Sequence, residues 1–261
     1  VKRATVLLTL RAAWRYAFLC ALRRSSVGEI GTAVKRLGLL LPSSGTVQEV
    51  DFYRRVPDGV TVHSARMRLR EATEVDELRM LEEYTVPAAR DLATIRPDVV
   101  VFSCTSAGAL RGNAYEQRLC DELAALTKAP VVSTMAAVRD ELRRLGVRSV
   151  AVVTPYPDAL NERVKASLET EGLRVPRVAG LGLLDSLAIA EVEPAAIHEF
   201  AVAEFRKAPA EALFLACCTF RAFDARDAIR ATLGVPVVTS NQAALGAAMR
   251  VLLDRPLRGC S

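Results

Sequence analysis

The chain is 261 residues long, with 51% hydrophobic and 25% charged residues, enough to bury the core of one large globular domain or two small ones. Its six cysteines show no regular short spacing and it has two histidines, so we expect neither a disulfide framework nor a metal site. Residues 1–36 hold eight Lys or Arg against one Glu, a net +7, so the rest carries −2 of the overall +5 and offers no basic nucleic-acid-binding face.

The basic segment of residues 1–35 differs in composition from the rest of the chain. Arg11 and Arg15 interrupt its apolar run, which falls short of the roughly 18–20 apolar residues that a membrane-spanning helix needs. No clear small-residue cleavage site of a signal peptide follows it. We therefore expect a basic extension that is not part of the core, no stable membrane insertion and, with reduced cysteines, a cytoplasmic protein.

From Leu37 onward, short apolar runs alternate with longer segments of helical period. The apolar runs are 36–42, 59–67, 97–104, 129–134, 148–155, 173–183, 211–219 and 235–240. The helical segments are 73–95, 114–127, 136–145, 158–171, 194–207, 224–233 and 241–253. This alternation predicts an α/β fold of parallel sheets covered by helices, with the ligand beyond the carboxyl ends of the strands.

The second half of the chain repeats features of the first. KAPVVSTMAAVRDELRRLGV (128–147) resembles GVPVVTSNQAALGAAMRVL (234–252), with Pro-Val-Val and two hydroxyl residues before a helix. Upstream of each copy an apolar run ends in cysteine and threonine, in VVFSCTSAG and LFLACCTFRAF. A duplicated unit would place these strand ends across a cleft, so that thiols from both halves flank one ligand.

The duplication divides the body into two pseudo-symmetric halves. We expect the first over residues 36–147, with Cys104, and the second over residues 148–261, with Cys217. The C-terminal segment is a candidate to complete the first half.

Five motifs, in this order, carry a family resemblance. They are RLGLLLPSSGTVQEVDFY (36–53), VVFSCTSAGALRG (100–112), AVVTPYPDALNERV (151–164), LGLLDSLAIAEV (181–192) and LACCTFRAFD (215–224). The body resembles the aspartate/glutamate racemase superfamily and, within it, the maleate cis-trans isomerase and arylmalonate decarboxylase branch. The resemblance implies two parallel-sheet α/β domains, an active site in the cleft between them, and no cofactor.

The resemblance also implies two catalytic thiols. The first matches Cys104. The longer family pattern, continued by Arg221 and Asp224, aligns the second on Cys217, whereas the shorter Gly-Cys-Thr pattern of racemases selects Cys218. Since adjacent side chains on a strand point to opposite faces, we expect only one of the two to face the cleft. A helical segment follows each thiol within a few residues, and we expect a nearby helix N-terminus or aligned backbone amides to lower the thiol pKa toward neutrality.

Donors for a substrate carboxylate are expected in the loops that follow the strands. The candidates are Ser43, Ser44, Thr105, Ser106, Tyr156 and Cys218. Thr105, Ser106 and Ser43 are alternatively ordinary helix caps. The two histidines are assigned to neither catalysis nor a metal.

Three departures from the family pattern bear on the substrate. Gly45 and Ser186 stand where maleate isomerases tend to have asparagine, which leaves the recognition of a compact dicarboxylate open. Conversely, decarboxylases of the branch generally have glycine where Cys104 stands. The presence of this thiol therefore favours an isomerase.

We expect a cofactor-independent isomerase of a small mono- or dicarboxylate, similar to maleate cis-trans isomerase. The resemblance implies that Cys104 adds to the alkene and that Cys217 handles the proton. An amino-acid or hydantoin racemase and an arylmalonate decarboxylase-like lyase are the enzymatic alternatives. A non-catalytic carboxylate-binding protein is the alternative of another class. The sequence leaves open whether the chain forms a homo-oligomer.

Overall fold

The structure, a computed structural model, describes residues 34–253. The predicted basic extension, residues 1–35, lies outside the described residues except for Val34 and Lys35, and Lys35 already begins the first strand. The strands are β1 (Lys35–Pro42), β2 (Val60–Met67), β3 (Val99–Phe102), β4 (Val131–Ser133), β5 (Val150–Thr154), β6 (Val178–Gly180), β7 (Ala212–Leu215) and β8 (Val237–Thr239). Each of the eight predicted apolar runs therefore forms a strand.

The helices connect these strands. They are α2 (Gln48–Tyr53), α3 (Glu74–Arg79), the π-helical turn η1 (Met80–Tyr84), α4 (Thr85–Ala93), α5 (Thr105–Leu110), α6 (Asn113–Thr127), α7 (Thr134–Arg144), α8 (Asp158–Glu169), α9 (Ser186–Glu191), α10 (Pro194–Lys207), α11 (Ala222–Leu233) and α12 (Ser240–Leu253). Sequence analysis missed α2, α5 and α9, because six residues are too few to show a helical period. None of these helices is long and apolar enough to cross a membrane, within the described part of the chain.

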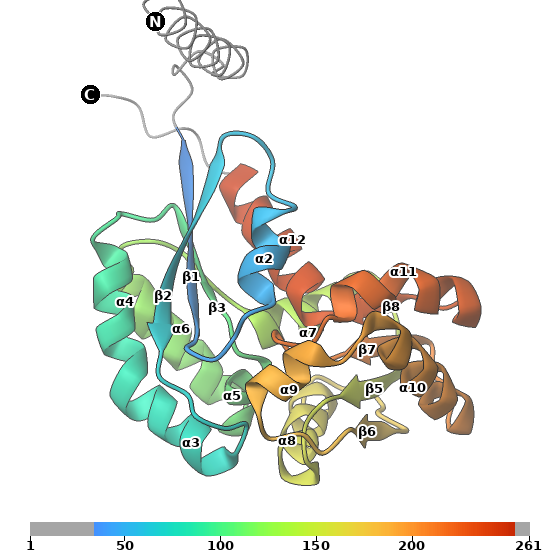
Figure 1. Ribbon diagram of the computed structural model, residues 1–261. Coiled ribbons are helices and arrows are strands. Elements are labelled where there is room, and N and C mark those ends of the chain that lie inside the picture. The colour runs from blue at the N-terminus through green and yellow to red at the C-terminus, as the bar shows by residue number, and fades with distance from the viewer. Residues whose placement is uncertain (1–33, 254–261) are drawn as a thin grey trace, which may run out of the picture. The chain divides into compact units, whose positions relative to one another are not determined.

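The strands form two four-stranded parallel sheets with equivalent orders, β2-β1-β3-β4 and β6-β5-β7-β8 (Figure 1). The predicted α/β class with two parallel sheets is thus confirmed. The central strands β3, β5 and β7 are apolar along nearly their whole length and buried at every residue. Such strands require helices on both faces of the sheet, because parallel sheets expose little surface to water.

The last helix of the chain covers the first sheet. On one face of that sheet, Leu39 and Val101 pack against Phe52 of α2 and against Leu245 and Ala248 of α12. Figure 1 shows α12 beside α2 and close to β1. The C-terminal helix therefore runs back from the second sheet to bury a face of the first.

A buried polar network ties α6, α7 and α8 together. The Arg139 guanidinium on α7 contacts Glu116 of α6 at 2.5 Å and donates to Ser167 of α8 at 2.9 Å. The Ser167 hydroxyl in turn donates to Asn113 at 2.7 Å, and Ser133 donates to Glu116. Because α8 belongs to the second half and α6 to the first, this network fixes one half against the other.

We expect Arg139→Met to lower the free energy of unfolding by about 3–5 kcal/mol, because it leaves the Glu116 carboxylate buried without its counter-charge. Urea denaturation measures the loss. Arg143→Met is the matched control on the same helix: its side chain is 60% exposed, so its ion pairs contribute less than about 1 kcal/mol. Equal losses in the two variants would contradict a stabilising role for the buried network.

Candidate functional site

The carboxyl ends of the two sheets meet at a small buried cavity. Cys104 follows β3 of the first sheet, and Cys217 and Cys218 follow β7 of the second. The full lining is Pro42, Leu69, Ala72, Glu77, Ser103, Cys104, Thr105, Ser106, Tyr156, Ser186, Ile189, Cys217 and Cys218. The cavity has a volume of about 30 Å³, room for about two water molecules.

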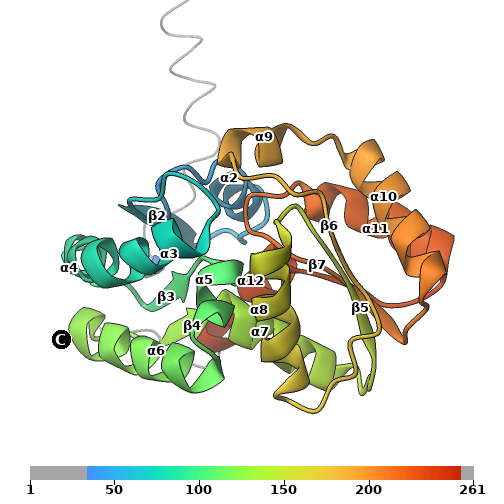
Figure 2. The same cartoon turned by 90° about the horizontal axis from the view of Figure 1, so that it is seen from below.

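Cys104 is the residue directly before α5, a short helix that lies between α3 and α8 (Figure 2). Its Sγ atom lies 3.8 Å from the hydroxyl of Ser106. Thr105 and Ser106 are the first two residues of α5, and the residue in the capping position is Cys104 itself, which makes no capping bond. The two hydroxyls are therefore not helix caps and instead line the cavity.

Cys217 has an unusual backbone conformation, with φ of +102° in a residue that is not glycine. Such a conformation costs of the order of 1–3 kcal/mol and persists only where the surroundings enforce it. Its N–H donates to the Ser240 hydroxyl at 3.0 Å, and the N–H of Thr219 donates to its Sγ atom at 3.3 Å. The loop thus aims an amide at the Cys217 sulfur, which favours a thiolate there.

The prediction that only one of the neighbouring cysteines faces the cleft is wrong. Strand β7 ends at Leu215, and the positive φ of Cys217 abolishes the strand alternation on which the prediction depended. Both Cys217 and Cys218 line the cavity. The Cys218 Sγ atom lies 3.4 Å from the Thr105 hydroxyl and 3.8 Å from that of Thr134, so it bridges the two halves.

The expected lowering of the thiol pKa values is also wrong, because the thiols are buried. Burial raises the pKa of Cys104 well above its usual range, and it raises the pKa of Cys217 to about 12, with a contribution from Cys218. The Tyr156 hydroxyl and the amide of Thr219 oppose this rise at Cys217 without reversing it. Desolvation of the charged form outweighs the amide donors, because both thiols are buried.

Ser43 and Ser44 are absent from the lining of the cavity, and Ser43 is exposed. The Ser43 hydroxyl accepts from the backbone N–H of Leu69 at 3.0 Å and so holds the segment after β2 in place. Ser44 donates at 2.9 Å to Ser186, which does line the cavity. Tyr156, by contrast, lines the cavity as a buried side chain.

Sequence reasoning missed two hydroxyls that hold the cysteine loops. Ser240 accepts from the Thr105 hydroxyl at 2.8 Å as well as from the Cys217 amide. Thr134 donates to the carbonyl of Phe102, the last residue of β3, at 3.0 Å. The repeat contained the signal, because Thr134 and Ser240 occupy equivalent positions after Pro-Val-Val.

Glu77 was missed as well. It is a fully buried carboxyl in the cavity wall, and burial raises its pKa to about 8. No sequence signal singles it out, because it lies in a helical segment rich in charged residues that resembles a solvated surface.

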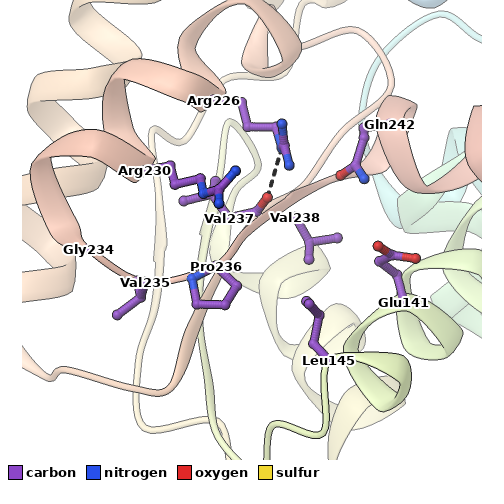
Figure 3. A pocket seen from close by; sticks show the side chains of 10 residues that line it. All are labelled: Glu141, Leu145, Arg226, Arg230, Gly234, Val235, Pro236, Val237, Val238 and Gln242. Carbon is purple, nitrogen blue, oxygen red and sulfur yellow. Dashed lines mark hydrogen bonds between the residues drawn. The ribbon is translucent and has the colours of Figure 1, made fainter.

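A larger hollow of about 470 Å³ lies elsewhere, beside β8, α7 and α11. Figure 3 shows its polar residues, among them Glu141, Arg226 and Arg230, with Arg226 donating to the carbonyl of Val237 at 3.0 Å. It contains no thiol and no residue that the sequence indicated. The small cavity between the sheets is therefore the candidate active site.

Comparison with known proteins identifies the family of this chain. The arylmalonate decarboxylase family matches residues 37–259. The chain belongs to that family. Arylmalonate decarboxylase of Bordetella bronchiseptica is 32% identical over 216 residues, which cover 82% of this chain and 89% of that protein.

Maleate isomerases are also among the relatives of this chain. That of Geobacillus stearothermophilus is 29% identical over 219 residues, covering 78% of this chain and 86% of that protein. The crystal structure of the maleate isomerase Iso from Pseudomonas putida superposes with a TM-score of 0.79 at 29% identity, covering 85% of this chain and 94% of the other. The predicted branch is therefore confirmed.

We expect Ser240→Ala to speed alkylation of Cys217 by iodoacetamide about tenfold. The variant leaves the buried Cys217 N–H without an acceptor, which costs about 1–3 kcal/mol and favours local opening of the loop. Peptide mass spectrometry measures the rate. Thr239→Ala is the matched control, since this buried neighbour bonds to the amide of Gln242 and to no cysteine. Unchanged Cys217 alkylation in Ser240→Ala would contradict the assigned anchoring.

Proposed function

We propose that the protein is a cofactor-independent isomerase of a small carboxylate, with cis-trans isomerisation of maleate to fumarate as its reaction. The observation that carries this proposal is the convergence of thiols from both halves, Cys104 and Cys217, on one buried cavity. Hydroxyls of Thr105, Ser106 and Tyr156 accompany them in the lining. This set supplies a nucleophile, a proton carrier and polar groups around the ligand.

In the proposed reaction, the Cys104 thiolate adds to one alkene carbon and forms a C–S bond. The alkene π electrons move to the neighbouring carbon, which takes a proton from the Cys217 thiol. The former double bond is now single and rotates. Cys217 then removes the proton, the double bond re-forms as the C–S bond breaks, and Cys104 leaves as a thiolate with the trans product free. Covalent addition divides one difficult step into easier ones.

The environments of the two thiols support different roles. Cys217 has the amide of Thr219 and the Tyr156 hydroxyl to stabilise its charged form, so it can return to a thiolate after giving up its proton. Cys104 lies beside the Ser106 hydroxyl, at the start of a helix in the other half. Burial disfavours two thiolates at once, since like charges in a dry cavity repel.

Decarboxylation is the second candidate, because Leu69, Ala72 and Ile189 give the cavity an apolar wall that would destabilise a carboxylate. That reaction needs only Cys217, whereas the cavity also contains Cys104. Release of carbon dioxide from an arylmalonate would identify a decarboxylase. A racemase would instead exchange an α-proton for deuterium in heavy water without forming fumarate.

We also propose a cytoplasmic location. The four cysteines within the described residues, Cys104, Cys120, Cys217 and Cys218, are free, and free thiols persist in a reducing compartment.

We expect Cys104→Ala and Cys217→Ala each to lower the rate of fumarate formation from maleate by about a thousandfold or more, because each thiol has a separate step. Proton NMR follows the reaction. Cys120→Ala is the matched control: this thiol is also buried and free, with a pKa raised to about 12, but it lies outside the cavity. Wild-type turnover in either of the first two variants would refute the two-thiol mechanism.

Cys218→Ser should retain activity within about tenfold, because a serine hydroxyl can keep the hydrogen bonds to Thr105 and Thr134. Cys217→Ser should be inactive, since an alcohol is a far weaker acid than a thiol. Steady-state rates of both variants distinguish the neighbours. An active Cys217→Ser together with an inactive Cys218→Ser would assign the second thiol to Cys218.

A further inference from the structure

Glu77 lines the cavity and has a buried carboxyl oxygen without a hydrogen-bond partner. Its side chain extends from α3 and is 1% exposed. The Oε1 atom accepts a hydrogen bond from the Ser106 hydroxyl, whereas the buried Oε2 atom makes no hydrogen bond. Buried polar atoms in native proteins are nearly always paired, so an orphan in the wall of an active-site cavity indicates a ligand group.

The protonation state of Glu77 indicates whether the missing partner is a hydrogen-bond donor or an acceptor. Burial, with a smaller contribution from Glu74, raises the pKa of Glu77 to about 8, so the carboxyl is neutral at pH 7. Because Oε1 already accepts from Ser106, the proton resides on Oε2. Glu77 therefore presents an O–H donor, and its missing partner is an acceptor.

The composition of the cavity lining makes the Glu77 donor important for binding an anionic ligand. The lining, all of it within described residues, includes no Lys, Arg or His, so an anionic ligand meets only neutral donors. The lining also includes the apolar side chains of Leu69, Ala72 and Ile189. A hydrogen bond is electrostatically stronger in such surroundings than in water.

We propose that Glu77, as a neutral carboxylic acid, donates a hydrogen bond from Oε2 to one carboxylate of a small dicarboxylate, and is thereby a specificity-determining residue of the site. This inference rests on the proposed function and deepens it. Glu77 selects dicarboxylates over monocarboxylates of the same length, because a monocarboxylate leaves the buried donor unpaired.

The same contact makes binding sensitive to pH. Glu74, on the same helix, is the titratable group that contributes to the pKa of Glu77. The other titratable groups of the cavity lining are the Tyr156 hydroxyl and the thiols of Cys104, Cys217 and Cys218. Burial raises the pKa values of all four cavity groups, so Glu77 ionises first as the pH rises. Above about pH 8 it loses the donated proton and repels the dianion, so the Kd rises with pH.

Equilibrium binding of succinate and butyrate, measured by isothermal titration calorimetry, tests this without turnover. Wild-type protein should bind succinate about tenfold or more tightly than butyrate at about pH 7, and lose about tenfold in succinate affinity at about pH 9.5. Glu77→Gln keeps a neutral N–H donor, so it should keep the preference and lose the pH dependence. Glu77→Leu should lose the preference itself.

Glu83→Gln is the matched control, because this exposed carboxylate pairs with Arg79 outside the cavity and should behave as wild type. Equal wild-type affinity for the two ligands, or an unchanged pH dependence in Glu77→Gln, would overturn the inference. Absence of fumarate formation with succinate binding as expected would reject the proposed reaction alone. The Gln variant keeps the test decisive even if Glu77→Leu does not fold.

Discussion

The site depends on one shared hydrogen-bond acceptor, the hydroxyl of Ser240. It accepts from the Cys217 N–H at 3.0 Å and from the Thr105 hydroxyl at 2.8 Å, so it joins the loop after β7 to the helix that follows Cys104. Ser240 is itself the first residue of α12, the helix that buries a face of the first sheet through Leu245. Packing of the core thus sets the relative position of the two thiols, which no local sequence preference could fix.

Burial of the titratable groups in this cavity affects their charge. Burial raises the pKa values of Cys104, Cys217 and Glu77, so the site is almost uncharged at neutral pH. A buried, neutral site is suited to anionic ligands, because no ionised side chain repels them and every donor acts at low dielectric. The same burial opposes formation of the thiolate that the proposed reaction needs, because desolvation disfavours the charged form.

Sequence patterns predicted the parts of the molecule that obey long-range periodicity. All eight strands followed from apolar runs, and parallel-sheet geometry then placed Cys104, Cys217 and Tyr156 near one another. The errors came from features of single residues. The positive φ of Cys217 invalidated the strand alternation, and Glu77 became buried only because the segment after β2 packs over the cavity. Burial of a charged residue is a tertiary property, which the period of a helix does not reveal.

The two halves share a topology but not a chemistry, and the difference lies at the equivalent strand ends. Thr134 and Ser240 each begin the helix after the fourth strand, yet Thr134 bonds to the carbonyl of Phe102 and Ser240 to the amide of Cys217. In the first half, Cys104 has an extended backbone and lies beside the Ser106 hydroxyl. In the second half, Cys217 has a strained backbone and its sulfur accepts from the backbone amide of Thr219. The two thiols thus have different surroundings at equivalent positions of the fold, which is what an acid and a nucleophile acting in one cavity would require.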